Sequence, residues 1–320
     1  MSPIDYRNPV YDGYFADPFV LACDGRYIAY GTGAIIDGLV FETLVSSDLV
    51  HWERMGGALQ PADPALGDTF WAPEVVRADD RFWMYYSVGT QDGPHQLRVA
   101  SAANALGPFV DEGVNLSADE RFAIDPHPFR DTDGTWYLFF ARDVLAGPRV
   151  GTQLAVDGLT TMSSVSGHSQ TVLAATADWQ LFEADRSMYG GRYDWHTLEG
   201  PTVRAQNGGY YLFYSGGSWQ GPGYAVGWAY ADHPLGPWRE PPDAEGRLLA
   251  TVPGQVFGPG HNSVLTSPGG LDVLIYHAWD AAGTKRRMCI DPLTWGPGGP
   301  STMGPSWQSR RLDPDFRLPA

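Results

Sequence analysis

One pattern recurs five times along the chain: a turn, followed by a short run of aromatic and aliphatic residues. The five copies are Asp24–Tyr30, Asp80–Tyr86, Gly134–Phe140, Gly208–Tyr214 and Gly269–Tyr276. Another short apolar segment begins about ten residues before each run, and a third segment follows most of them. Helical periodicity is scarce, so these segments are predicted to be β-strands. Five units of three or four strands predict an all-β fold, a five-bladed β-propeller in which residues 1–320 form a single domain.

The segments before the aromatic runs carry polar residues at matching positions. Alignment by distance from the runs places five residues in one column: Asp17, Ala72, Asp125, Glu199 and His261. The innermost strand of each propeller blade lines the central channel, so these side chains are expected to converge there. A single Asp-Pro pair is a common turn initiator. Three carboxylates crowded together repel one another, however, and a purely structural protein gains nothing from them, so the repetition favours an active site in the channel.

Three converging carboxylates can cleave a glycosidic bond. Hydrolysis with inversion needs a protonated acid at the leaving oxygen and a carboxylate that activates water on the opposite face of the sugar. Glu199 has the longest side chain of the three and is the predicted acid, with Asp17 as the base. Asp125 is predicted to raise the pKa of the acid through its negative charge. From the residues alone, the roles of the two aspartates could be exchanged.

Five segments in this order resemble those of glycoside hydrolase family 43, over a stretch from about Asn8 to Trp295. They are Phe15-Ala16-Asp17-Pro18, Trp71-Ala72-Pro73-Glu74, Ile124-Asp125-Pro126, Leu198-Glu199-Gly200-Pro201 and Gly258-Pro259-Gly260-His261-Asn262. The resemblance implies an inverting, five-bladed enzyme with Asp17 as base, Asp125 as modulator of the acid's pKa and Glu199 as acid.

The resemblance also implies a sugar pocket lined by Trp71, Ala72 and Ile124. Glu74 lies two residues past Ala72, so it is expected to share the same strand face and to border the pocket. Trp179, Trp195 and Trp219 are further candidates for stacking against sugar rings. Two of these tryptophans belong to Arg142–His196, the longest connection between repeats, and long loops beside a site often determine specificity.

Two further site residues are implied by the resemblance. An arginine of the last repeat is expected to bind sugar hydroxyls, and between Arg286 and Arg287 the spacing to Ile290 favours Arg286. His261 is expected either to contact the sugar or to stand beside a calcium ion that is otherwise held mainly by water. No organic cofactor is expected.

Composition restricts the partners. A net charge of −16 repels phosphate backbones and so argues against nucleic acid. Cys23 and Cys289 are too few for a disulfide framework and are predicted to be buried free thiols, with a bridge between the first and last blades as the alternative. The N-terminal residues lack the apolar core of a signal peptide, and no apolar stretch is long enough to cross a membrane. The expectation is a cytoplasmic protein without a membrane partner, of undetermined oligomeric state.

The expected substrates are xylo- or arabino-oligosaccharides derived from hemicellulose. The Trp71-Ala72-Pro73-Glu74 form favours an exo-acting β-D-xylosidase or α-L-arabinofuranosidase, or an enzyme with both activities. The alternatives are an arabinan-degrading enzyme, endo or exo, and a non-catalytic sugar-binding propeller. Five-bladed enzymes that act on fructans carry the motif Asn-Asp-Pro-Asn. The first acidic motif here is Ala16-Asp17-Pro18-Phe19, which argues against that class of enzyme.

Overall fold

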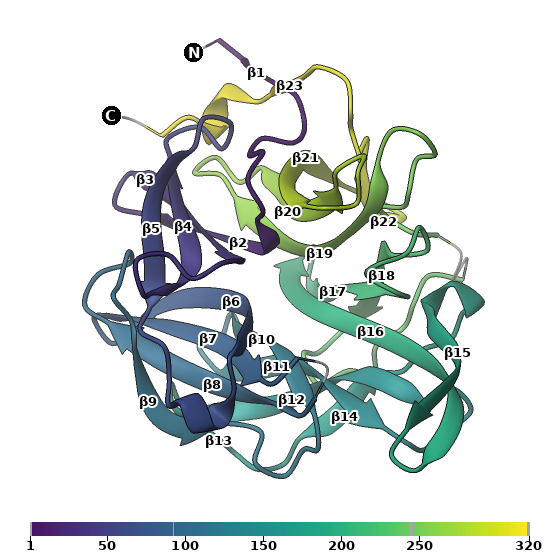
Figure 1. Cartoon of the computed structure of the whole chain (residues 1–320). Coiled ribbons are helices and arrows are strands. Elements are labelled where there is room, and N and C mark those ends of the chain that lie inside the picture. Colours follow the sequence, from purple (N-terminus) through teal and green to yellow (C-terminus); the bar gives the residue numbers. More distant parts are fainter. Residues whose placement is uncertain (1, 92, 243–245, 319–320) are drawn as a thin grey trace.

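The computed structural model describes residues 2–91, 93–242 and 246–318, which form strands and three short 3-10 helices. The strands are arranged in a ring, with one strand of each blade near the centre (Figure 1). These inner strands are β2 (Ala16–Cys23), β6 (Thr69–Ala78), β10 (Ala123–Arg130), the second half of β16 (Gly191–Gln206) and β19 (Phe257–Thr266). Each contacts the next, and β19 contacts β2, which closes the ring. The predicted all-β, five-bladed propeller is confirmed.

The five aromatic runs form the second strand of each blade, as predicted. They are β3 (Arg26–Thr32), β7 (Arg81–Gly89), β11 (Trp136–Val144), β17 (Gly209–Gly216) and β20 (Asp272–Trp279). The third strands are β4 (Val40–Ser46), β8 (His95–Ala102), β12 (Gly151–Thr161), β18 (Ala225–Ala231) and β21 (Arg286–Gly296). Three blades have a fourth strand at the outer edge: β5 (Glu53–Leu59), β9 (Val110–Asn115) and β22 (Gly299–Thr302). Two short strands, β13 (Ser164–Val165) and β14 (Gln170–Leu173), pair with β12.

The runs are apolar throughout because both faces of each second strand are buried. Successive side chains of a strand point to opposite faces. Ile28 and Tyr30 therefore pack toward the second blade, whereas Tyr27 and Ala29 pack toward the fifth. The same alternation produces five hydrophobic clusters, one at each interface between neighbouring blades. The core is thus a ring of five interfaces around the channel.

The third and fourth blades are joined more closely than the others. A hairpin of β15 (Leu181–Met188) and the first half of β16 extends from the fourth blade, and β16 also pairs in parallel with β12 at two positions. These strands form one nine-stranded sheet. The hairpin lies within the long Arg142–His196 connection and places its residues beside the channel.

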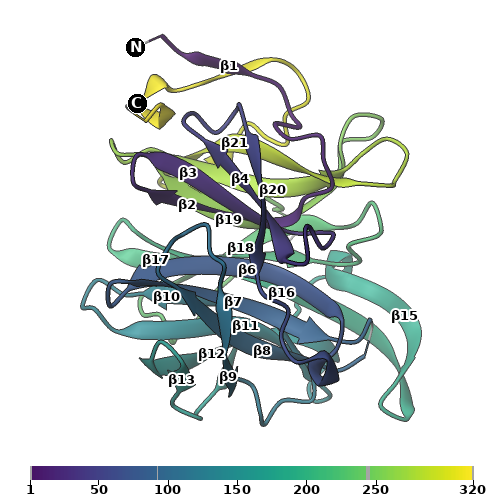
Figure 2. The ribbon, with the colours of Figure 1, turned by 60° about the vertical axis from the view of Figure 1, so that its left-hand side comes forward.

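The two ends of the chain pair with each other. Strand β1 (Ile4–Tyr6) is antiparallel to β23 (Arg310–Leu312), and both lie together at one side of the ring (Figure 2). The buried carboxylate of Asp291, on β21, accepts hydrogen bonds from the hydroxyls of Tyr6 at 3.0 Å and Tyr276 at 2.7 Å and from the amide of Ser306 at 2.9 Å. It therefore connects the N-terminal segment, the last blade and the C-terminal segment.

Cys23 and Cys289 are both free, as predicted, but only Cys289 is buried and Cys23 is partly exposed. Among the described residues, no helix has the length and apolar character needed to cross a membrane.

Candidate active site

Every inner strand has a β-bulge at the same level of the channel. The bulges begin at Asp17, Ala72, Asp125, Gly200 and His261, all of which have a positive φ between 48° and 60°. In four of the five, proline follows. Proline is tolerated because bulged residues make no ladder hydrogen bond. Non-glycine residues rarely adopt positive φ, and such strain is concentrated at functional sites.

The predicted column is wrong by one residue in the fourth blade. The residue there that matches Asp17 and Asp125 is Gly200, and Glu199 precedes it, at the level of Ala16 and Ile124. Counting back from the aromatic runs misses this shift because the hairpin turns differ in length. Gln206 and Gly209 close a two-residue turn, whereas five residues separate Arg130 from Trp136.

The amides of the bulges form a ring of hydrogen bonds between blades. Four of them donate to a side chain at one matching position on the second strand of the neighbouring blade: Ala72 to Thr32 at 2.8 Å, Asp125 to Ser87 at 2.9 Å, His261 to Ser215 at 2.7 Å and Asp17 to His277 at 3.1 Å. The matching residue in the third blade is Ala141, which has no acceptor. The amide of Gly200 donates instead to Oδ2 of Asp125, at 2.9 Å. The one bulge amide that departs from this pattern, that of Gly200, therefore holds the predicted catalytic carboxylate of Asp125.

The three carboxylates line one cavity of about 280 Å³. Its other lining residues are Tyr14, Thr32, Trp71, Ile124, Trp219, His261 and Arg286. The structure thus brings together Asp17, Asp125 and Glu199 with four of the other six predicted site residues.

Ala72 and Glu74, by contrast, are not among the residues that line this cavity. The Glu74 carboxylate lies 2.7 Å from Nδ1 of His127, whose Nε2 accepts the amide of Val203 at 3.0 Å. Glu74 therefore joins blades and does not face the pocket. Ala72 is buried at the bulge.

Asp17 is held in its charged form. Burial opposes its ionisation, but Arg286, whose Nη1 lies 3.2 Å from Oδ1, and then His261, whose Nδ1 lies 3.4 Å from the same oxygen, outweigh it. Together they hold the pKa of Asp17 well below its ordinary value. Burial lowers the pKa of His277 to about 4, so this imidazole is neutral and its Nδ1 accepts the amide of Asp17. Asp17 is therefore an ionised carboxylate, the form that a general base requires.

The surroundings of Glu199 favour its protonated form. Burial and then the negative charge of Asp125 raise its pKa to about 7, although Tyr224 donates a hydrogen bond of 2.7 Å to Oε1. Burial and then the charge of Asp17 also raise the pKa of Asp125, while the amide of Gly200 favours its ionised form. Two neighbouring buried carboxylates repel each other when both are charged. The pair therefore keeps a proton near neutral pH, and Glu199 binds that proton more tightly than Asp125 does.

Arg286 faces the site, and Arg287 does not. The guanidinium of Arg286 lies 4.6 Å from the ring centre of Trp219 and donates to the hydroxyl of Tyr14 at 2.9 Å. Arg287 instead pairs with Asp12 at 2.8 Å on the surface. Arg286 follows the turn Asp280–Lys285, in which Oδ1 of Asp280 accepts the amide of Thr284 at 2.7 Å. The choice of Arg286 over Arg287 therefore agrees with the geometry.

Sequence reasoning missed Tyr14 and Tyr224. Nothing in their local sequence distinguishes them among the 16 tyrosines of the chain. Of the three candidate tryptophans, Trp219 lines the cavity and Trp195 lines an adjoining one. Trp179 stacks on Tyr214, with 6.2 Å between the two ring centres, and lines neither cavity.

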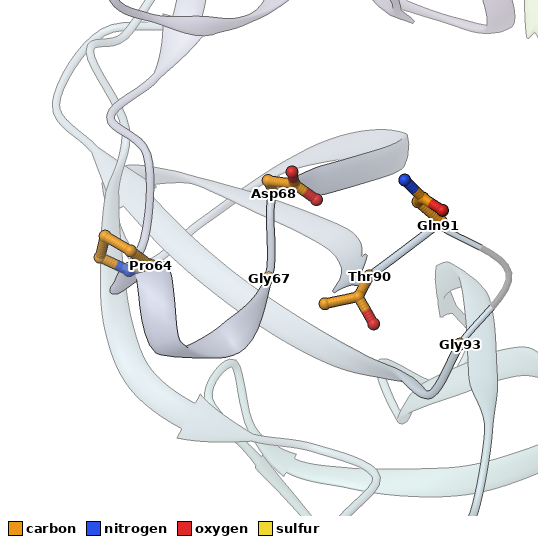
Figure 3. A pocket seen from close by; sticks show the side chains of 6 residues that line it. All are labelled: Pro64, Gly67, Asp68, Thr90, Gln91 and Gly93. Atoms are coloured by element: carbon orange, nitrogen blue, oxygen red, sulfur yellow. The ribbon is translucent and has the colours of Figure 1, made fainter.

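A larger hollow, of about 570 Å³, lies beside the 3-10 helix Pro64–Leu66. It is lined by Pro64, Gly67, Asp68, Thr90, Gln91 and Gly93 (Figure 3). Asp68 is the only carboxylate among these residues, so the hollow offers no acid–base pair. Chemistry, rather than size, locates the active site in the channel.

A five-bladed propeller whose channel holds an ionised aspartate and a protonated glutamic acid defines an acid–base glycoside hydrolase. The sequence profile described as "Glycosyl hydrolases family 43" matches residues 6–300, and the chain belongs to this family. Members of the family act with inversion.

Relatives with several activities are similar to the chain. A β-D-galactofuranosidase of Aspergillus niger is 28% identical, over 91% of this chain and 83% of the relative. An extracellular endo-α-(1→5)-L-arabinanase of Bacillus subtilis is 26% identical, over 89% of this chain and 86% of the relative. The crystal structure of a thermostable family-43 glycoside hydrolase is 31% identical and superposes with a TM-score of 0.83, covering 95% of this chain and 97% of that one. The family is thus established, and these names cover more than one substrate.

Proposed function

We propose that the protein removes terminal pentose units, β-D-xylosyl or α-L-arabinofuranosyl, from hemicellulose-derived oligosaccharides. The observation that carries the proposal is the pairing of an ionised Asp17 with a protonated Glu199 in one small cavity. A cavity of about 280 Å³ suits one sugar ring better than a passing polysaccharide chain, which supports exo action.

In the proposed reaction, Asp17 removes a proton from water as the water attacks the anomeric carbon. Glu199 donates its proton to the leaving oxygen. Tyr224 occupies Oε1 of Glu199, which leaves Oε2 to carry the transferred proton. Arg286 keeps Asp17 ionised and offers N–H donors to sugar hydroxyls, while Trp71 and Trp219 supply faces for the apolar side of the ring.

The test is a panel of p-nitrophenyl β-D-xylopyranoside, α-L-arabinofuranoside and β-D-galactofuranoside, with xylobiose and linear arabinan. The proposal expects release of single pentoses and inverted configuration of the first product in proton NMR. Release of arabinan oligosaccharides would support the arabinanase alternative. Turnover of the galactofuranoside alone would replace the pentose assignment, and retained configuration would contradict the role of Asp17.

We also propose a calcium ion beside His261, on the strength of the family resemblance. Calcium prefers oxygen ligands. The neighbouring Asn262 is 2% exposed, and neither atom of its side-chain amide has a partner. Among the described residues, no cluster of three or more His, Cys, Asp or Glu side chains is placed to hold a metal. The ion would therefore lie beside His261 and be held by Asn262 and mainly by water, and it would offset the charge of the nearby carboxylates.

Chelation tests this proposal. Treatment with EDTA should lower the melting temperature, and added Ca²⁺ should restore it, because a ligand that binds the folded state stabilises it. A melting temperature indifferent to both treatments would leave His261 as a channel residue without a metal.

A further inference from the structure

A second cavity adjoins the first at Glu199. The two share Trp71, Ile124, Glu199 and Trp219 among their lining residues. The first contains all three predicted catalytic carboxylates and Arg286, whereas the second contains only Glu199 of these four. An acid that protonates a leaving oxygen stands between the sugar being cleaved and the group that departs. The second cavity therefore lies on the leaving-group side of the acid.

The β15–β16 hairpin supplies much of the wall of this second cavity. Phe182, Arg186 and Met188 come from β15, and Trp195 comes from the paired half of β16. The guanidinium of Arg186 lies 4.7 Å from the ring centre of Phe182 and 5.6 Å from that of Trp195. The hairpin stands at the edge of the ring in Figure 1 and reaches the channel through β16. It thus offers aromatic rings and a planar set of N–H donors, the groups that bind sugars.

Charge in the cavity is balanced. Arg186 is the only cation among the lining residues, and Asp143 is the carboxylate besides Glu199. Asp143 accepts hydrogen bonds from Thr152 at 2.8 Å and from Tyr189 at 2.7 Å, so it is fixed within the wall. A balanced, partly aromatic site favours a neutral ligand over a uronic acid. Its volume of about 100 Å³ is smaller than that of the first cavity, which favours a single ring.

We propose that the β15–β16 hairpin forms a leaving-group subsite for one neutral sugar ring, with Phe182 and Arg186 as its main contacts. The proposal rests on the proposed function and deepens it. The subsite selects oligosaccharides over other glycosides, because binding energy from a sugar leaving group is available only when that sugar fits the hairpin.

The experiment compares two substrates that share the same pentose. One is the disaccharide that the wild type cleaves best, and the other is the pentosyl fluoride of the same anomeric configuration, which has no sugar leaving group. In Phe182→Ala and Arg186→Ala, kcat/KM for the disaccharide should fall on the order of tenfold or more, while kcat/KM for the fluoride stays within about twofold of wild type. Fluoride hydrolysis also shows that the variants are folded.

Arg192→Ala is the matched control. Arg192 lies on the same hairpin, is paired with Asp185 on the surface and does not line the cavity, so its replacement should leave both substrates unaffected. Equal losses on disaccharide and fluoride, or no loss on either, would overturn the subsite. Failure of the wild type to hydrolyse any pentosyl fluoride or disaccharide would instead overturn the proposed function.

Discussion

Asp17 and Glu199 line the same cavity, but their pKa values are shifted in opposite directions. Both are buried, and burial alone would keep both protonated. The difference comes from their neighbours, since Arg286 compensates the charge of Asp17 and Asp125 opposes a charge on Glu199. The division of labour between base and acid is therefore set by the side chains around each carboxyl group.

Replacement of Glu199 by Gln should lower kcat/KM much more for substrates with poor leaving groups than for substrates with good ones. Glutamine has no transferable proton, so kcat/KM for xylobiose or another sugar leaving group should fall about 10²- to 10⁴-fold. The loss should be much smaller for a dinitrophenyl pentoside, which departs without protonation. Steady-state kinetics on the two substrates measures the contrast, and equal losses on both would count against the acid role.

Replacement of Asp125 by Asn should move the basic limb of the pH–rate profile toward acid. The charge of Asp125 raises the pKa of Glu199, so its removal lets the acid ionise at a lower pH. At a fixed pH above the limb, activity should fall about tenfold for each pH unit of the shift and should recover partly on acidification. A profile in which only the acidic limb moves would identify Asp125 as the base and exchange the two aspartates.

Asp17 and Asp125 stand out in the sequence because each begins a bulge with a following proline, and this local chemistry repeats. Arg286 could be chosen over Arg287 because alternate residues of a strand face opposite ways. Tyr14 and Tyr224 could not be found, since each reaches the site through contacts between segments far apart in sequence. Tyr224 lies on the loop before β18 and meets Glu199, which is 25 residues earlier.

At the scale of elements, the bulges determine how the site is built. Five bulges turn five polypeptide segments inward at one level, and their amides are satisfied by the neighbouring blade. The position of the bulge within each strand follows from the register, which a count of residues does not contain. For this reason the repeat predicted the strands correctly but misaligned Glu199 by one residue.

Ala141→Ser tests why the amide of Gly200, unlike the other four bulge amides, donates to Asp125. A hydroxyl at this position would match Thr32, Ser87 and Ser215, and should draw the amide of Gly200 away from Asp125. Asp125 would then lose a fixed donor, and kcat for a sugar leaving group should fall about tenfold with KM little changed, a loss equivalent to about 1.4 kcal/mol. Ala141→Cys is the control, because a thiol of similar size is a weak acceptor. If serine and cysteine behave alike, steric effects rather than the amide ring explain any loss.

At the scale of the whole molecule, the five interface clusters were foreseeable and the pairing of the two chain ends was not. The continuous apolar runs already indicate strands buried on both faces. The pairing of β1 with β23 joins two three-residue strands of mixed polarity, Ile4–Tyr6 and Arg310–Leu312, which carry too little pattern to predict. Their position depends instead on Asp291, a buried carboxylate with partners in three distant segments.

Asp291→Ala should lower stability without damaging catalysis. It leaves buried donors on Tyr6 and Tyr276 without an acceptor, at a cost of about 2–3 kcal/mol, and should lower the melting temperature by several degrees. Thermal unfolding gives the change, and kcat of the folded variant should stay near wild type. Asp12→Ala removes an exposed surface pair and should have little effect on the melting temperature. Similar melting temperatures for the two variants would show that Asp291 does not secure the ends of the chain.

The turn that precedes Arg286 also carries a single lysine that can be labelled chemically. Lys285 is exposed at the end of this turn and is the only lysine in the chain, so amine-reactive dyes have one side-chain target besides the α-amino group. Arg286 follows it directly and pairs across the hairpin with Trp279, which stacks on Trp219 at 5.8 Å. A fluorophore on Lys285 would therefore be attached directly beside the residue that contacts Asp17. A change in its emission when a glycoside is added would report binding at the cavity, which makes the unmodified sequence a starting point for an optical glycoside sensor.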